Sequence, residues 1–174
     1  MKLSEIKTSK IFNVAGFDLI KLFDDNGRTA VVFADTVFDC EFGKNNNFSE
    51  STILKRLNGE ILPKITECVG TDNVLEFETD LTSLDGLKTH GSVKSKIAIP
   101  TFDYYRQNVH IFDEHKLDKW WWLATPDTTR EHYNDNWIVC VSPGGGICSD
   151  IYNYSIGVRP FLFFVSDIDV SCED

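Results

Sequence analysis

The alternation of apolar and polar positions predicts a strand-rich first third of the chain. Residues 11–23 and 28–42 are dominated by apolar, β-branched and aromatic side chains, and the sequence Asp-Asp-Asn-Gly at 24–27 separates them. This arrangement predicts a β-hairpin. Within residues 17–23 both alternating faces are largely apolar, so we expect other elements to cover this strand on both sides.

Helical periodicity marks two later stretches. Apolar residues recur on one stripe over residues 53–65, which predicts a helix. Its N-cap is Ser49 or Ser51, and Pro63 is expected to kink or restart it. A second apolar stripe predicts another helix over residues 102–112.

Short strands and a long polar connection complete the pattern. The connection spans residues 80–96 and is expected to be the most mobile part of the chain. Together the elements predict a single α+β domain over residues 1–174, with two helices set against twisted antiparallel sheet and an N-terminal β-hairpin region over residues 1–48. The remaining strands are expected at residues 73–79, 97–100, 120–125, 136–142, 146–152 and 158–165.

Composition favours a rigid and acidic protein. The chain has 13 Phe, 5 Tyr, 4 Trp and only 1 Met, which favours an aromatic core with β-type packing. The net charge of −10 argues against direct nucleic-acid binding, because that binding neutralises phosphates with Lys and Arg. Scattered acidic residues are typical of a solvated surface, and mimicry of a nucleic acid is the alternative.

Several features predict a cytoplasmic location. No apolar run approaches the ~20 residues of a membrane span, so we expect no membrane partner. Residues 1–10 lack the apolar core of a signal peptide, and the five Cys show no C-x-x-C spacing, which suits a reducing compartment. Cys140 and Cys148 are equidistant from Gly144, so a hairpin turning there places them opposite each other. Two reduced thiols are the favoured interpretation, and a disulfide is the alternative.

Residue types that carry catalysis or bind metals form no recognisable pattern. The four His are never spaced at i, i+4, and there is no G-x-S-x-G sequence, so we expect no catalytic residue, no metal and no cofactor. The Asn- and Asp-rich residues 134–136, with Asp127 and Asp150, leave calcium as an alternative ligand. The glycines at 144–146 precede an apolar strand, which predicts a hairpin turn and not a phosphate-binding loop.

A polar interval over residues 127–155 is the most informative feature, because apolar sequence encloses it on both sides. Its Tyr, Asn, Ser, Asp and Thr residues are the types that recognition surfaces use. Binding residues also tend to lie on loops held by a rigid scaffold. We therefore expect a recognition surface here, with an ordinary surface loop as the alternative. The candidate binding residues are Asp127, Thr128, Arg130, His132, Tyr133, Asn134, Asp135, Asn136, Asp150, Tyr152, Asn153 and Tyr154.

Structural roles are expected for residues on either side of this interval. Side chains alternate along a strand, so Trp120, Trp121 and Trp122 are expected to enter the core on both faces, and a platform for stacking sugar or base rings is the alternative. Arg159 precedes Pro160 in an apolar strand and requires a partner if it is buried. We expect a carboxylate or carbonyl groups of the polar interval, which would make Arg159 a clamp that holds the loops.

The end of the chain resembles a known family. The sequences WWWLATP at 120–126, WIVCVSPGGGI at 137–147 and GVRPFLFF at 157–164 resemble the ending of an uncharacterised domain family of bacteria and their phages, which closes with W-L-R-S-P and G-V-R-P-A-L motifs. Residues 53–65 and 97–107 resemble it more loosely. The most specific matches are Trp122, Leu123, Pro126, Gly157, Val158, Arg159 and Pro160, and the departures are Ala124, Thr125 and Phe161.

The resemblance implies a C-type-lectin-like fold over residues 49–174, shared with formylglycine-generating enzymes and with the variable proteins of diversity-generating retroelements. Those variable proteins present diversified side chains just before a terminal strand, and the corresponding interval here is 127–155. The catalytic cysteines of formylglycine-generating enzymes have no match in this chain. The sugar-binding motifs of calcium-dependent lectins are also unmatched.

These observations predict a non-catalytic protein-binding module of phage or prophage origin. By analogy with phage biology, we expect it to act in the host cytoplasm on a host protein, as an anti-CRISPR-like or other inhibitor of host defence. One alternative is an enzyme or enzyme remnant of the formylglycine-generating type that uses Cys140 or Cys148. The others are a phage tail or receptor-binding component and an acidic nucleic-acid mimic.

Overall fold

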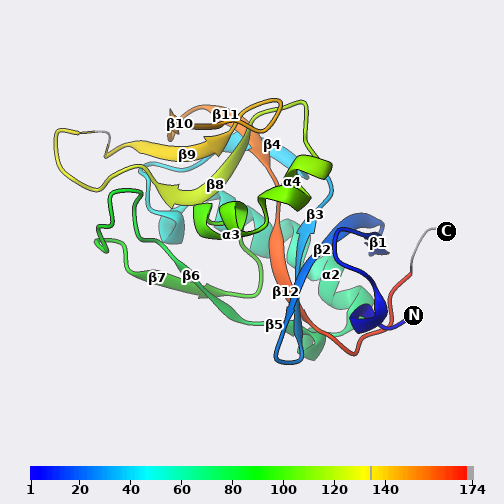
Figure 1. Ribbon diagram of the computed structural model, residues 1–174. Coiled ribbons are helices and arrows are strands. Elements are labelled where there is room, and N and C mark those ends of the chain that lie inside the picture. Colours follow the sequence, from blue (N-terminus) through cyan, green and yellow to red (C-terminus); the bar gives the residue numbers. More distant parts are fainter. Residues whose placement is uncertain (134, 172–174) are drawn as a thin grey trace.

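The computed structural model describes residues 1–133 and 135–171, and over these it is an α+β structure (Figure 1). The α+β class predicted from the sequence is confirmed. The first sheet has the order β1 (Ile11–Val14), β2 (Phe17–Asp25), β3 (Arg28–Phe33), β12 (Phe161–Val165) and β5 (Val74–Leu75). The second has the order β10 (Ile147–Ile151), β9 (Trp137–Val141), β8 (Trp121–Pro126), β11 (Ser155–Val158) and β4 (Phe38–Glu41). β6 (Phe77–Asp80) and β7 (Ser92–Ser95) form a separate two-stranded sheet.

The β2–β3 hairpin forms where the sequence predicts it. Asn26 and Gly27 both have positive φ, at 49° and 82°, which gives the backbone twist that a two-residue hairpin loop requires. Leu19, Ile20 and Leu22 are all buried, so both faces of β2 are covered as expected.

Two short links carry the chain between the sheets, from β3 to β4 and from β11 to β12, and the helical segment between β4 and β5 makes a longer crossing. Next to the second link, Gly157 pairs in parallel with Trp121. A Cβ atom on Gly157 would lie 2.5 Å from Thr36 Cγ2 and 2.9 Å from the Trp120 carbonyl oxygen. The close approach of the strands therefore requires glycine at this position.

The first predicted helix is one continuous helical run over residues 52–69, made of α1 (Thr52–Arg56), a π-helical turn η3 (Leu57–Ile61) and α2 (Leu62–Val69). Ser51 caps it, with its Oγ accepting a hydrogen bond from the Leu54 amide at 3.0 Å. The π-helical turn ends just before Pro63, whose ring cannot tolerate the regular bonding pattern of the preceding turn.

The second predicted helix, over residues 102–112, is wrong as a single element. It consists of two short helices, α3 (Phe102–Gln107) and α4 (Val109–Glu114), that meet at Asn108. The Asn108 side chain donates to the Tyr104 carbonyl at 2.8 Å, which ends α3, and Val109 is 43% exposed instead of joining the apolar stripe. The two-helix arrangement expected from the sequence is therefore corrected. In Figure 1, α2 lies behind β12 and β3, while α3 and α4 lie in front.

Other predicted boundaries also move. Residues 97–100 form no strand and make only a bridge between Ala98 and Phe161. Residues 73–79 and 158–165 each divide between two sheets. The connection over residues 80–96, expected to be mobile, contains β7 and a loop bonded to the rest of the protein. Short 3-10 turns lie at η1 (Leu3–Glu5), η2 (Phe48–Glu50) and η4 (Thr71–Asn73).

The tryptophan run is divided between core and surface. Trp121 and Trp122 are 1% and 0% exposed, on opposite faces of β8, whereas Trp120 is 44% exposed. The Trp122 indole donates to the Cys40 carbonyl at 3.1 Å, so its polar atom is satisfied inside the core. Of the helices in the described part of the chain, none has the length and apolar character needed to cross a membrane.

Candidate functional site

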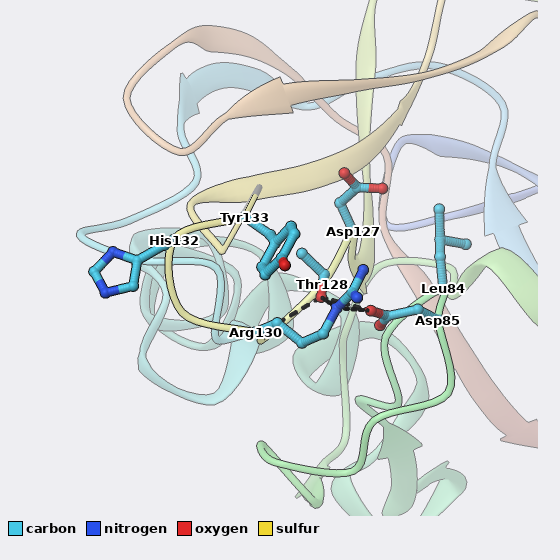
Figure 2. A pocket seen from close by; sticks show the side chains of 7 residues that line it. All are labelled: Leu84, Asp85, Asp127, Thr128, Arg130, His132 and Tyr133. Atoms are coloured by element: carbon cyan, nitrogen blue, oxygen red, sulfur yellow. Dashed lines mark hydrogen bonds and ion pairs between the residues drawn. The ribbon is translucent and has the colours of Figure 1, made fainter.

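A hollow of about 540 Å³ opens beside the loop that precedes β9, at the left of Figure 1. Two loops supply its walls, residues 81–91 between β6 and β7 and residues 127–133 between β8 and β9. Figure 2 shows the lining side chains from close by. They are Leu84, Asp85, Asp127, Thr128, Arg130, His132 and Tyr133. Five of the predicted binding residues therefore line one hollow.

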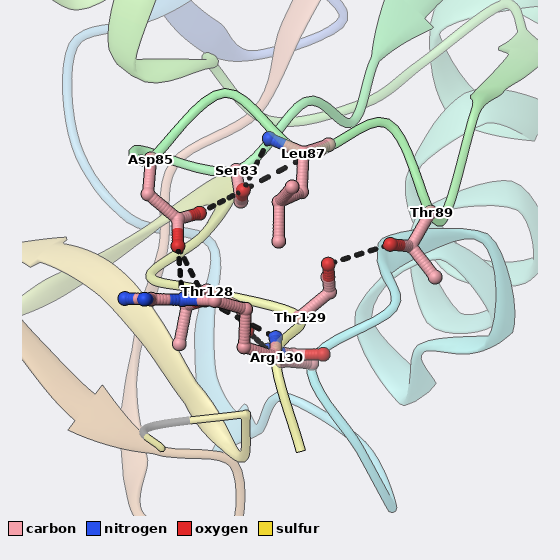
Figure 3. A network of polar contacts seen from close by, with 8 residues as sticks. Ser83, Asp85, Leu87, Thr89, Thr128, Thr129 and Arg130 are labelled. Carbon is pink, nitrogen blue, oxygen red and sulfur yellow. Dashed lines mark hydrogen bonds and ion pairs between the residues drawn. The ribbon is translucent and has the colours of Figure 1, made fainter.

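The two loops are joined through Asp85 (Figure 3). Its Oδ2 atom accepts a hydrogen bond from Thr128 Oγ1 at 2.6 Å and lies 3.0 Å from Nε of Arg130. The hydroxyls of Thr89 and Thr129 lie 2.7 Å apart and add a second link. The loop conformations therefore depend on each other.

Asp85 is held in its charged form. Hydrogen bonds from the Ser83 and Thr128 hydroxyls, followed by the attraction of the Arg130 guanidinium, lower the pKa of the Asp85 carboxyl below its ordinary value of 3.8. The carboxylate is consequently ionised at neutral pH, and its bonds to Thr128 and Arg130 are charge-assisted.

A third segment supports the hollow from below. Asn46 is only 2% exposed, and its Nδ2 donates to the Thr128 carbonyl at 2.8 Å. Its Oδ1 lies 2.8 Å from Nε2 of His90, and because this oxygen can only accept, the proton lies on the imidazole nitrogen. Burial lowers the pKa of His90, so the ring is neutral at neutral pH.

The outer wall is aromatic and cationic. The Arg130 guanidinium carbon lies 4.5 Å from the centroid of the Tyr133 ring, and Tyr133 is 63% exposed. Between them, His132 adopts a φ of 65°, in the left-handed region that non-glycine residues rarely use. The His132 side chain points away from the Arg130 side chain in Figure 2. The turn therefore folds Tyr133 back over Arg130 and leaves both accessible from solvent.

A second hollow of about 250 Å³ adjoins the first. Leu84 lines both hollows and is 43% exposed. The second is lined by Asp80, Thr82, Ser83, Leu84, Thr101, Phe102, Asp103, Arg106 and Thr125. Across the two hollows the lining includes the carboxylates of four Asp residues and the guanidinium groups of two Arg residues, so the combined surface is acidic. We call this combined surface the acidic face.

The other candidate binding residues lie outside the hollows. The Tyr152 amide donates to the Asn136 carbonyl at 3.1 Å, which places residues 152–154 beside the loop at 127–136. Tyr152 packs partly against the core, and its carbonyl accepts from the Phe42 amide at 2.9 Å. Tyr154 is 56% exposed. The candidates that line neither hollow are Asp135, Asn136, Asp150, Tyr152, Asn153 and Tyr154.

Asn134, a candidate binding residue and a candidate calcium ligand, lies outside the described residues. Among residues 1–133 and 135–171, no group of three or more His, Cys, Asp or Glu side chains is placed to hold a metal ion. The Oδ1 of Asp150 accepts a hydrogen bond from the following amide of Ile151 at 2.9 Å.

Arg159 is a clamp, but not for the polar interval. It is 1% exposed, and its Nε donates to the Phe33 carbonyl at 2.7 Å, with Nη2 3.4 Å and 3.3 Å from the carbonyls of Ala34 and His115. The expectation that its partners lie within residues 127–155 is corrected. The reason is that Arg159 lies at the link between β11 and β12, beside the end of β3, so its guanidinium reaches the Phe33 and Ala34 carbonyls and supplies their hydrogen bonds.

The two thiols considered for catalysis are poorly suited to act as catalytic nucleophiles at neutral pH. Burial, followed by its contact with Cys148, raises the pKa of Cys140, and burial also raises the pKa of Cys148. A reactive cysteine requires the opposite shift, because the thiolate is the nucleophile.

One serine contacts a histidine elsewhere in the structure. Ser9 Oγ lies 3.1 Å from Nε2 of His115 and donates to Glu114 at 2.5 Å. The same Nε2 lies 2.9 Å from the Ser9 carbonyl, which can only accept, so this nitrogen carries the proton and cannot act as a base for Ser9. The cluster therefore ties the N-terminal segment to α4.

Sequence reasoning identified five of the residues that line the two hollows and missed the others. Leu84, Asp85 and Thr89 lie in the connection expected to be mobile, and Asn46 and His90 were not recognised as the support of the site. The Asp85-Gly86 turn was the one local signal, and it indicates a turn without indicating what the turn contacts. The partners are separated by about 40 or 80 positions in sequence, as the bonds between Thr89 and Thr129 and between Asn46 and Thr128 show.

No protein-family model, curated protein or solved structure matches the chain, so the geometry of the acidic face is the basis on which its function is inferred.

Proposed function

We propose that the protein is a non-catalytic protein-recognition module and that the acidic face is its binding surface. The observation that carries the proposal is the combination of exposed contact groups with a buried hydrogen-bonded support. Leu84 and Tyr133 are 43% and 63% exposed. Asn46, which supports them, is 2% exposed and is hydrogen-bonded to both loops of the hollow, through Thr128 and His90. Contact groups on a preorganised surface bind tightly because little conformational entropy is lost on association.

The chemistry of the surface favours a protein partner. Tyrosine provides a large amphipathic contact area with few rotatable bonds, and a cation held over its ring, as Arg130 is over Tyr133, limits its motion further. The side chains that line the two hollows are mainly polar, and Leu84 lines both, so a partner surface with complementary relief fits them better than a small molecule, whose pockets are mostly apolar.

Charge defines the kind of partner surface. Carboxylates outnumber guanidinium groups around the two hollows, and the whole chain carries a net charge of −10. A partner with exposed Lys or Arg side chains is attracted at long range and pairs with these carboxylates at the rim. We therefore infer a basic protein surface as the binding partner.

The resemblance of residues 120–164 to a bacterial and phage family supports a biological setting for this proposal. We propose a C-type-lectin-like arrangement for residues 49–174, and a host protein, of the kind that phage inhibitors of host defence bind, as the partner. The family resemblance supports both statements, and the location of the acidic face within residues 80–133 agrees with display of polar loops by that fold.

A pull-down from host lysate tests the proposed surface. A Leu84→Ala and Tyr133→Ala double variant is compared with the wild type and with Ile147→Ala. Ile147 is a matched control because it is 44% exposed, close to Leu84 at 43%, and it begins β10 at the hairpin distant from the acidic face. We expect the double variant to lose the captured protein, the control to retain it, and both to melt within a few degrees of the wild type. Equal capture by all three proteins contradicts the proposal.

A further inference from the structure

Two cysteines face each other across the hairpin of β9 and β10. The antiparallel register pairs Cys140 with Cys148 directly, and the two Sγ atoms lie 2.6 Å apart. The neighbouring Ser142 amide donates to the Gly146 carbonyl at 2.8 Å, and pairs two positions apart along an antiparallel ladder are of the same type. Cys140 and Cys148 therefore occupy a hydrogen-bonded pair, for which the Cα separation of about 5.5 Å lies within the range that a disulfide spans.

The surroundings leave one thiol accessible and the other protected. Cys140 is 0% exposed on β9, whereas Cys148 is partly exposed on β10, an edge strand of the second sheet. The turn between them uses Gly144 and Gly145 with φ of 86° and 93°, and the Tyr105 hydroxyl donates to the Gly145 carbonyl at 2.9 Å, which fixes the hairpin. A small reagent can therefore reach Cys148 first, and the Sγ atom of Cys140 lies beside that of Cys148, 2.6 Å away.

We propose that Cys140 and Cys148 are a modification site that forms a reversible intramolecular disulfide by exchange with a low-molecular-weight disulfide. The Cys148 thiolate attacks one sulfur of the small disulfide, the S–S bond of that reagent breaks, and its other half leaves as a thiol after taking up a proton. Cys140 then loses its proton and attacks Cys148 Sγ, and the second half of the reagent leaves as a thiol. Two electrons and two protons pass from the protein to the reagent, so the step is balanced.

The electrostatics of the hairpin predict how the reaction proceeds. Burial raises the pKa of Cys148, and Asp150 raises it further, so the attacking thiolate is scarce at neutral pH. We expect oxidation to be slow near pH 7 and to accelerate as the pH rises. The same Asp150 carboxylate repels an anionic reagent, so a neutral disulfide is the better probe.

The consequence for the fold is local. A bond between Cys140 and Cys148 closes a short loop in the unfolded chain, and it is expected to raise the melting temperature by roughly 5–10 °C for a protein of this size. Because the β9–β10 hairpin ends at the bonded pair of Asn136 and Tyr152, the bond also restrains the base of the loop over residues 127–136.

Thiol counting on the full chain tests the proposal. The protein is incubated with hydroxyethyl disulfide, the remaining thiols are alkylated, and the products are analysed by intact mass and peptide mapping. We expect alkylation sites to fall from the five cysteines of the sequence by two, and the protein to be lighter by two hydrogen atoms before alkylation. Peptide mapping should place the bond between Cys140 and Cys148, and dithiothreitol should restore both thiols.

Two variants make the result specific. Cys148→Ala should abolish the internal bond, whereas Cys68→Ala, which removes an exposed cysteine outside the hairpin, should leave it unchanged. The proposal is overturned if all five cysteines remain alkylatable at high reagent concentration, if Cys148 stops at a mixed disulfide with the reagent, or if the bond maps to Cys68. These measurements need no binding partner, so their outcome is independent of the proposed recognition function.

Discussion

Replacing Arg159 with Ala tests how the two sheets are held together. The guanidinium lies 5.0 Å from the Trp121 ring and 5.3 Å from the Phe112 ring, and it donates to carbonyls at the end of β3 and the end of α4. It therefore connects the first sheet, the second sheet and a helix at one buried point. No described carboxylate forms an ion pair with it.

The expected loss in the free energy of unfolding is the difference between lost interactions and a relieved desolvation cost. The short bond to Phe33 contributes about 2 kcal/mol and the two longer bonds about 1 kcal/mol each, because a charged donor is involved. The cavity left by truncation costs a further 2–5 kcal/mol or so. Against this, burial lowers the pKa of Arg159 from 12.5 to about 10, which corresponds to roughly 3 kcal/mol of desolvation cost that the substitution relieves. The net loss in the free energy of unfolding is about 3–6 kcal/mol.

Thermal and urea unfolding measure this loss. For a chain of 174 residues, we expect the melting temperature of the Arg159→Ala variant to fall by about 10–15 °C. Arg159→Met keeps most of the side-chain volume and removes the charge, so the melting temperature of this variant should fall by roughly half as much. A melting temperature within about 3 °C of the wild type for Arg159→Ala would refute the reasoning, since it would mean that the bonds and packing contribute no net stability. Partner binding by folded Arg159→Ala should persist, because the side chain lies away from the acidic face.

Two further predictions concern single residues in the frame and the site. Gly157→Ala should lower the free energy of unfolding, measured by urea denaturation, by about 1–3 kcal/mol, because the new Cβ would collide with Thr36. Gly59→Ala has no atom within 4 Å of the new Cβ and should raise the free energy of unfolding by about 0.5–1 kcal/mol. The lowered pKa of His90 means that the folded state binds a proton less readily than the unfolded state. The free energy of unfolding should therefore be unaffected by His90 above the ordinary pKa of 6.5 and should decline as the pH falls below that value. His90→Gln, which keeps a donor for Asn46, should show a smaller decline. An identical pH profile for the variant would contradict this assignment.

Local patterns predicted the elements better than they predicted sheet membership. The β2–β3 hairpin follows from alternation and an Asn-Gly turn, both of which act over a few residues. By contrast, residues 158–165 read as one apolar strand, yet the chain changes sheets at Arg159 and Pro160. The break depends on carbonyls supplied by β3 and α4, which are distant in sequence, and no local pattern contains that information.

The site shows the same limit. Composition predicted a recognition surface within residues 127–155, because Tyr, Asn, Ser, Asp and Thr are types that recognition surfaces use, and five residues of that interval line the first hollow. It could not identify the loop over residues 81–91, whose Leu84 and Asp85 acquire their role by lying beside Thr128 and Arg130. A polar connection that folds back on another polar loop has the same composition as one that remains free.

The order of residues 127–133 in the acidic face depends on a small number of hydrogen bonds. Fixing the seven residues 127–133 costs on the order of 10 kcal/mol of backbone entropy, and in this stretch only Thr128 is buried, so apolar burial offsets little of that cost. The hydrogen bonds to Asn46, Asp85 and Thr89 contribute about 1–2 kcal/mol each and must supply much of the compensation. Loss of one bond of about 1 kcal/mol changes the population of the ordered loop roughly fivefold. The shape of the acidic face therefore depends on these bonds, and a substitution at Asn46 is expected to weaken the proposed partner binding without removing any contact atom.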